Sequence, residues 1–106
     1  MVRRFAVDIP MERIASFCQR WKVVELCLFG SVLEAGFGPH SDVDVLVSFA
    51  PEAEWDLFDA THMEEELAEI LGRPVDLVTR RSLERSRNWI RREAILRSAE
   101  PIYVAR

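Results

Sequence analysis

Hydrophobic residues recur along this chain with two different periods, and the pattern predicts alternating helices and strands. After Pro10, which suits the first position of a helix, apolar residues recur at i, i+3, i+4 and i+7. The members of this stripe are Ile14, Phe17, Cys18 and Trp21. The nearly continuous apolar run 23–29 is typical of a strand covered on both faces. The runs 42–49 and 74–78 predict two further strands.

Two more helices are predicted between and after these strands. The first spans about 55–71 and ends at Gly72, a common helix cap. Its apolar stripe is Ala60, Met63, Leu67, Ile70 and Leu71. The second is expected over about 80–98, with Leu83, Ile90 and Ala94 buried and Trp89 off the stripe. Residues 101–104 predict a last strand or an extended tail.

The order of these elements predicts an α/β fold in which helices pack on a small mixed β-sheet. With 106 residues, we expect one domain over residues 1–106. The two cysteines, Cys18 and Cys27, lie in apolar surroundings, which favours buried free thiols and a cytoplasmic location. No segment approaches the roughly 20 apolar residues of a membrane span, and residues 1–4 lack the apolar stretch of a signal peptide.

Candidate chemistry gathers at residues 28–47. Asp42 and Asp44 are two residues apart on a predicted strand, so they share one face, while the valines between and after them take the other. Two ionised carboxylates at this spacing repel each other unless a cation lies between them. Mg²⁺ binds through one or two carboxylates plus substrate phosphates. Upstream, Gly30-Ser31 stands at the end of a strand, where a glycine lets the backbone approach a phosphate.

A purely structural interpretation competes with this one. Asp42 and Asp44 can serve as cap or turn residues of a loop between two buried strands. Asp76, which lies between apolar neighbours in the run 74–78, can be a surface residue of an edge strand. His40, in the glycine- and proline-containing loop before the aspartates, is more typical of an exposed side chain than of a phosphate contact.

The spacing Gly30-Ser31, ten residues, Asp42-Val43-Asp44 resembles the signature of the nucleotidyltransferase superfamily that includes DNA polymerase beta. Over residues 10–104 the layout is similar to that of the minimal nucleotidyltransferases, antitoxin-type partners of helical HEPN ribonuclease toxins. The resemblance implies a polymerase beta-like nucleotidyltransferase fold. It also implies a third carboxylate on a later strand, a place that Asp76 fills.

The same resemblance implies an activity: transfer of AMP from Mg-ATP to a protein hydroxyl, a tyrosine of a cognate HEPN toxin. Asp42, Asp44 and Asp76 would be catalytic and hold two Mg²⁺ ions, and Asp76 would also accept the proton of the attacking hydroxyl. Gly30, Ser31 and Ser41 would contact the nucleotide. The chain would then be the antitoxin of a toxin–antitoxin pair.

The chain departs from the family pattern just after Gly-Ser, where relatives often carry arginines. Here the residues are Val32, Leu33, Glu34 and Ala35. Two alternatives therefore stay open: an antitoxin with weak or no catalysis that neutralises its partner by binding, and a small-molecule nucleotidyltransferase of the antibiotic-modifying type. The latter requires an acceptor-binding wall that a homodimer would have to build. The sequence leaves open whether the chain forms homo- or hetero-oligomers.

Charge is strongly segregated along the chain. Residues 42–76 carry eleven acidic side chains and one basic one, whereas residues 80–97 carry seven arginines and two glutamates. The basic segment is interpreted as a solvated helix that balances the acidic half, or as a docking surface for a protein partner. Nucleic-acid binding ranks last because the whole chain has a net charge of −4.

Overall fold

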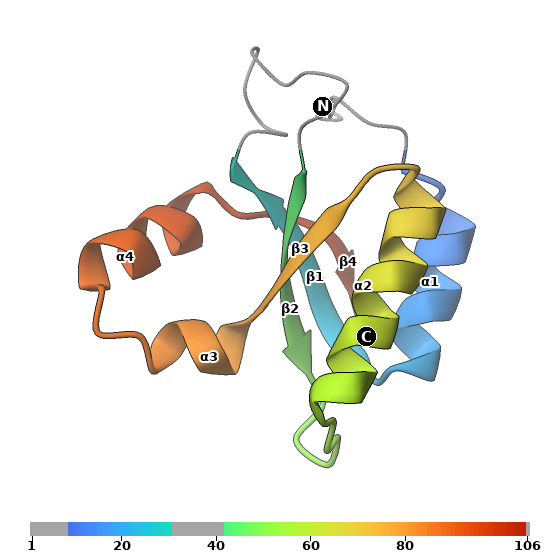
Figure 1. Ribbon diagram of the computed structural model, residues 1–106, viewed down its shortest axis with the longest axis horizontal. Coiled ribbons are helices and arrows are strands. Elements are labelled where there is room, and N and C mark those ends of the chain that lie inside the picture. Colours follow the sequence, from blue (N-terminus) through green and yellow to red (C-terminus); the bar gives the residue numbers. More distant parts are fainter. Residues whose placement is uncertain (1–8, 31–41, 106) are drawn as a thin grey trace.

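The computed structural model describes residues 9–30 and 42–105, and its strands form one four-stranded sheet (Figure 1). In chain order the elements are α1 (Met11–Arg20), β1 (Val23–Phe29), β2 (Val43–Phe49), α2 (Leu57–Leu71), β3 (Val75–Thr79), α3 (Arg80–Glu84), α4 (Trp89–Ser98) and β4 (Glu100–Val104). The strand order is β3-β2-β1-β4. β2 and β3 are parallel, and β1 is antiparallel to both β2 and β4. The predicted mixed α/β sheet is confirmed.

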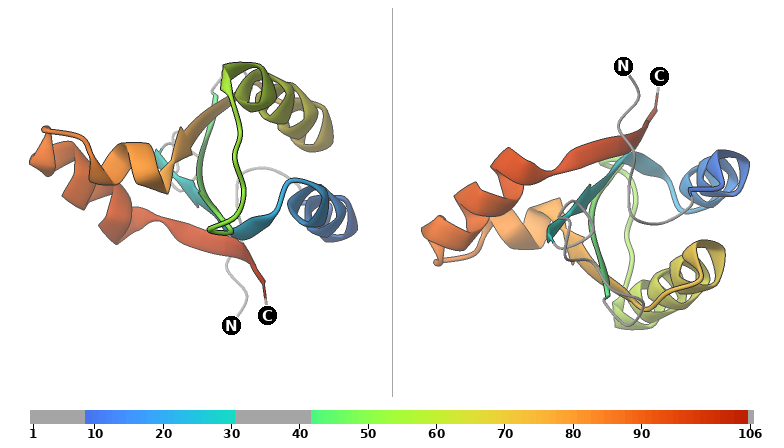
Figure 2. Two further views of the ribbon diagram at one scale, coloured as in Figure 1. Left: turned by 90° about the horizontal axis from the view of Figure 1, so that it is seen from below. Right: turned by 90° about the horizontal axis from the view of Figure 1, so that it is seen from above.

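Helices cover both faces of this sheet. Seen along the sheet, α1 and α2 lie against one face, and α3 and α4 lie against the other (Figure 2). The larger apolar core is on the α1/α2 face, and its fully buried members include Ile14, Phe17, Leu28, Val45 and Leu67. A smaller cluster lies under α3 and α4 and consists of Cys27, Phe29, Leu46, Leu83 and Ile95. The expectation that the first strand is covered on both faces is confirmed.

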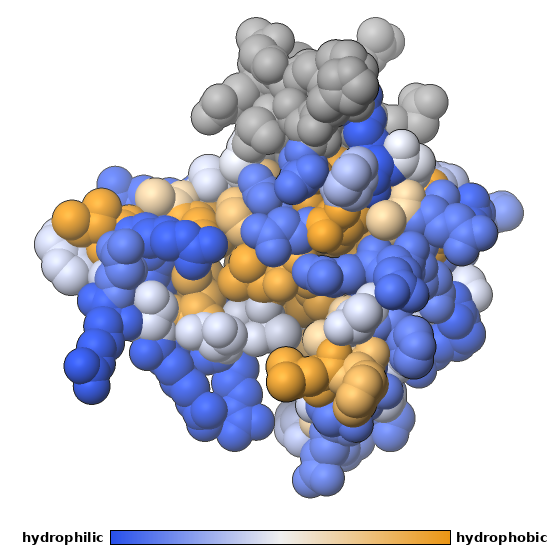
Figure 3. Space-filling model, viewed as in Figure 1, coloured by the Kyte–Doolittle hydropathy of each residue, from blue (hydrophilic) through white to orange (hydrophobic). Residues whose placement is uncertain are grey.

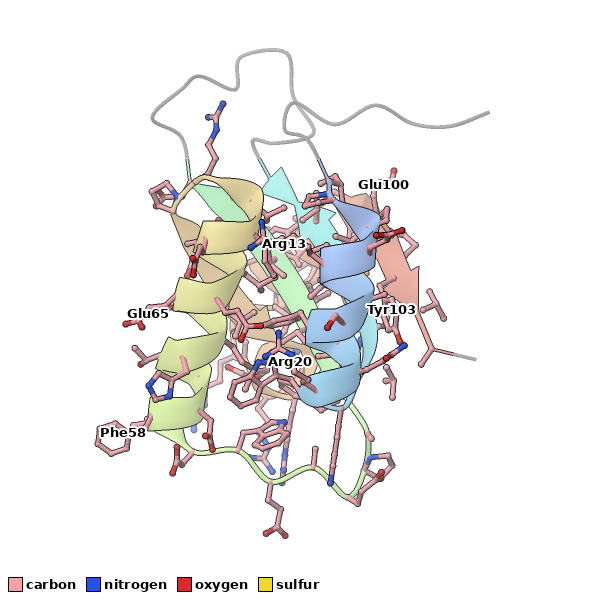
Figure 4. The ribbon with its side chains drawn as sticks, turned by 90° about the vertical axis from the view of Figure 1, so that its right-hand side faces the viewer. Arg13, Arg20, Phe58, Glu65, Glu100 and Tyr103 are labelled. Atoms are coloured by element: carbon pink, nitrogen blue, oxygen red, sulfur yellow. The ribbon has the colours of Figure 1, made fainter. Side chains whose placement is uncertain are left out.

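The α1/α2 layer follows the sequence pattern closely. Pro10 is the residue before the first turn of α1 rather than its first helical residue. Asp56 caps α2 through a reciprocal capping box with Asp59, and Gly72 ends that helix in the left-handed conformation at φ 70°. Arg20 of α1 points toward α2, where its guanidinium donates to the Glu66 carboxylate with Nη1 and Oε1 3.0 Å apart (Figure 4). These caps and contacts explain why both helices form where the pattern predicts them.

The prediction of one helix over 80–98 is wrong, because the chain breaks between α3 and α4. Asn88 begins a new helix: its side chain accepts from the backbone N–H of Arg91, and its own N–H donates to Ser86 Oγ. Leu83 and Ile95 both enter the smaller cluster. Twelve residues apart in a continuous helix, they would point about 120° away from each other. The break lets both side chains reach the sheet.

The predicted burial along this segment needs a related correction. Leu83 is buried as expected, but Ile90 is 66% exposed and Ala94 is also exposed. Ile95 takes the buried position instead. Trp89 is 62% exposed, in agreement with its predicted place off the stripe. The error follows from extending one helical register through the break.

Both cysteines are buried free thiols, as predicted. Burial raises the pKa of Cys18 to about 12 and that of Cys27 to about 11, so neither is a reactive thiolate at neutral pH. Among the described residues, no helix is long and apolar enough to span a membrane.

Candidate active site

The parallel pairing of β2 and β3 brings two predicted carboxylates together. Asp44 and Asp76 are direct partners in the register of these strands. Side chains alternate between the faces of a strand, and Val43 and Val45 are buried in the α1/α2 core. Asp44 therefore lies on the face that α3 and α4 cover, together with Asp76. Asp44 is half-buried and Asp76 is exposed.

Gly30 lies against the side chain of Asp44. It follows β1, whose last residue, Phe29, pairs with Asp44. Gly30 has a φ of +76°, a region that other residues rarely adopt. A Cβ at this position would lie 2.3 Å from Asp44 Oδ2. The Asp44 carboxylate thus lies directly against Gly30, so this glycine has a role that sequence reasoning missed: it makes room for a carboxylate.

The electrostatics of Asp44 are those of a site that favours a cation. Burial is the largest cause that raises the pKa of Asp44, and the neighbouring carboxylates of Asp76 and then Asp42 raise it further. Arg91 of α4 acts in the opposite direction and lowers this pKa. Asp42 is exposed and immediately precedes β2. A divalent cation at these carboxylates would relieve their mutual repulsion.

The donor set fits Mg²⁺ shared with a substrate. Within residues 9–30 and 42–105, no three acidic, histidine or cysteine side chains form a ready metal-binding group. Mg²⁺, however, usually binds proteins through one or two carboxylates and completes its shell with phosphate and water oxygens. Asp44 and Asp76 are opposite each other on neighbouring strands, and neither is fully buried. They therefore supply the two carboxylates that such a site needs. Ser31 and Ser41, the predicted nucleotide contacts, lie outside the described residues, as do Val32 and Glu34.

Among the described residues, Arg91 acts on Asp44 although sequence reasoning did not single it out. It was one of seven arginines in a segment treated as a single helix. Asn88, three residues before Arg91, is the sequence signal that could have identified it. Asparagine is a common helix cap, and here it begins a new helix and so sets which face of that helix carries Arg91.

A hollow lies at the opposite end of the sheet from Gly30 and Asp44. It has a volume of about 510 Å³ and is lined by residues that include Trp55, Leu57, Met63 and Leu77. Hydrophobic surface gathers here at the start of α2, where Leu57 is 85% and Phe58 79% exposed (Figure 3). None of the three predicted carboxylates lines this hollow. The candidate active site is therefore the end of the sheet where Gly30, Asp44 and Asp76 meet.

Comparison with known proteins identifies the family of the chain. The family model described as "Nucleotidyltransferase domain" matches residues 11–100. No curated protein matches the chain.

Solved structures give the same fold. A protein assigned as a minimal nucleotidyltransferase is 32% identical, with a TM-score of 0.65 over 87% of this chain and 88% of its own. A toxin–antitoxin structure with AMP-PNP is 20% identical, with a TM-score of 0.68 over 92% of this chain and 75% of that one. A complex of a tri-AMPylated Shewanella oneidensis HEPN toxin with an MNT antitoxin matches at 22% identity, with a TM-score of 0.61 over 90% and 70%. The chain thus belongs to the nucleotidyltransferase domain family and is of its minimal type.

Proposed function

We propose that this protein transfers AMP from ATP to a hydroxyl of a partner protein, a tyrosine of a HEPN toxin, and thereby acts as an antitoxin. The observation that carries the proposal is the placement of Asp44 opposite Asp76 with Gly30 directly against the Asp44 carboxylate. A structural neighbour that is a complex of an AMPylated HEPN toxin with its antitoxin supports the choice of acceptor.

In the proposed reaction the acceptor oxygen attacks the α-phosphorus of ATP. A new oxygen–phosphorus bond forms, the bond to the bridging oxygen breaks, and pyrophosphate leaves. Asp42, Asp44 and Asp76 would hold the divalent cations, which neutralise the triphosphate and the charge that develops on it. Asp76, the more accessible member of the strand pair, accepts the proton of the attacking hydroxyl.

A second candidate is neutralisation of the toxin by binding alone. It is favoured by the residues after Gly30-Ser31, where Val32 and Glu34 replace the arginines typical of the family. A site without these cations would bind a triphosphate less tightly. This candidate predicts a stable complex with the partner and no covalent change.

Intact-mass spectrometry separates the two candidates. The chain is mixed with Mg²⁺, ATP and the protein encoded by the neighbouring gene. AMP transfer adds one or more AMP units to the partner. The Asp44→Asn variant removes the addition, because an amide is a poor ligand for Mg²⁺ compared with a carboxylate.

The matched control is Asp56→Asn, which removes one acidic charge at the opposite end of the sheet and keeps a residue that caps a helix equally well. It should leave AMP transfer unchanged. A stable complex whose mass stays unmodified with the unaltered chain would leave binding alone as the function.

A further inference from the structure

The helix α4 lies on the same face of the sheet as the candidate carboxylates. Its buried residue, Ile95, is in the smaller cluster together with Leu46 of β2. Leu46 follows Asp44 by two residues and therefore points to the same face of β2. Because Ile95 and Leu46 belong to one buried cluster, the middle of α4 packs on the face of β2 that carries Asp44, near that residue.

Arg91 is on the side of α4 that faces this site. It precedes Ile95 by four residues, so the two side chains are neighbours on one face of the helix. The first turn is held in place because the Arg91 backbone N–H donates to Asn88 Oδ1, 3.1 Å away. In this position the Arg91 charge acts on Asp44.

Two other arginines of the basic segment are already occupied by protein groups. Arg92 donates from Nη1 to the carbonyl oxygen of Ser86 at 2.9 Å. Arg80 donates to Ser48 and pairs with Glu25 at 2.9 Å. By contrast, the Arg91 guanidinium makes no hydrogen bond or ion pair with the described residues. Its donors therefore remain available to a ligand of the candidate site.

We propose that Arg91 binds the β- or γ-phosphate of the nucleoside triphosphate, in place of the arginines that the Gly30-Ser31 loop lacks. The inference rests on the proposed function, because it assigns a residue to the same site. A guanidinium binds phosphate through two parallel, charge-assisted hydrogen bonds. Three carboxylates and a triphosphate bring several negative charges together, and Arg91 supplies a positive charge from α4.

Arg97 offers a matched control within the same helix. It lies six residues after Arg91, which turns it about 120° away around the helix axis. It lines an outer groove with Trp89, Ile90, Glu93 and Ala94. The two arginines have the same charge and sit in the same helix, so they differ mainly in whether they face the site.

Calorimetric titration with two nucleotides tests the inference without any catalytic step. The unaltered chain, Arg91→Gln, Arg91→Lys and Arg97→Gln are each titrated with Mg-AMP-PNP and with AMP. We expect Arg91→Gln to weaken AMP-PNP binding about 10- to 100-fold, the worth of a hydrogen bond to a charged group. AMP binding should change less than about 3-fold, because AMP lacks the phosphates concerned. Arg91→Lys should recover part of the affinity, and Arg97→Gln should bind both nucleotides as the unaltered chain does.

The outcomes are distinguishable. If the unaltered chain binds Mg-AMP-PNP and Arg91→Gln binds it equally well, the role of Arg91 is overturned while the proposed function stands. An equal loss of AMP and AMP-PNP affinity also overturns it, since it would mean that Arg91 only supports the structure of the site. If the unaltered chain does not bind Mg-AMP-PNP, both the inference and the proposed function fail.

Discussion

The two faces of the sheet differ in what they bury and in what they expose. The face under α1 and α2 holds the larger apolar cluster, with Leu28, Val45 and Leu67 fully buried. Within residues 9–30 and 42–105, the face under α3 and α4 holds a cluster of five buried residues and also carries Asp44 and Asp76. One face therefore supplies most of the stability, and the other leaves room for polar groups and a ligand.

Strand geometry makes this division possible. Because alternate residues point to opposite faces, β2 contributes valines to one layer and Asp44 to the other within the same seven residues. The helices follow the same division: α2 has fifteen residues and a capping box, whereas α3 has five residues. A short, interrupted helical layer covers less of its face, which keeps the end with the carboxylates accessible.

The largest effect is expected from shortening core side chains on the α1/α2 face. Leu67→Ala should lower the free energy of unfolding by about 2–5 kcal/mol, because it leaves a cavity in the larger cluster. Ile95→Ala, in the smaller cluster, should cost about 2 kcal/mol, at the lower end of the same range. Urea unfolding monitored by circular dichroism measures both. Equal costs would contradict the assignment of most of the stability to one face.

The next effect concerns Gly30 and Gly72, which both have a positive φ. Gly30→Ala should lower stability by about 1–2 kcal/mol through backbone strain and should also abolish AMP transfer, because its Cβ would displace the Asp44 carboxylate. Gly72→Ala has a similar φ of +70° but no atom within 4 Å of the added Cβ. It should lose about the same stability and keep full activity. Unfolding curves and intact-mass assays on both variants check this, and full activity in Gly30→Ala would refute the role given to that glycine.

Helix caps on the two faces give a smaller, paired effect. Asp56→Ala and Asn88→Ala each remove the side chain that caps the first turn of α2 or α4 and should each cost about 1 kcal/mol. Only Asn88→Ala should also weaken Mg-AMP-PNP binding, because Asn88 fixes the turn that carries Arg91. Thermal unfolding and calorimetry measure the two properties. Equal nucleotide affinity in the two variants would mean that α4 does not contribute to the site.

The smallest effect is a dependence of stability on pH. The pKa of Asp44 is raised in the folded state, so the folded chain holds this proton to a higher pH than the unfolded chain does. The free energy of unfolding should therefore fall as pH rises from the unfolded pKa through the folded one. Asp44→Asn removes this contribution, so its stability relative to the unaltered chain should increase over that pH range. Urea unfolding at several pH values without Mg²⁺ measures the difference, and a constant difference would contradict it.

Local patterns predicted most of the fold. The strand over 23–29 was predicted with its observed bounds, and the helix before it was predicted from one apolar stripe. The prediction of a single helix over the basic segment is wrong for two reasons. Arginine-rich surface positions carry little hydrophobic periodicity, and the helix cap at Asn88 is not evident from that periodicity. The same holds for the candidate site. Asp44 and Asp76 are on strands that the sequence predicts, whereas Arg91 is on the helix whose start and buried face the sequence does not predict correctly.

By itself, the sequence determined the periodic elements, their order and the Gly-Ser and Asp-x-Asp spacing that resembles nucleotidyltransferases. These features depend on residues that are close together in the sequence, so they can be identified without the structure. Only the tertiary structure decided that Asp44 lies opposite Asp76 and against Gly30, and that the charge of Arg91 acts on Asp44. Strand pairing and helix packing bring together residues that are far apart in the chain. The register of the strands and the positions of the helices depend on the packing of all the core side chains together.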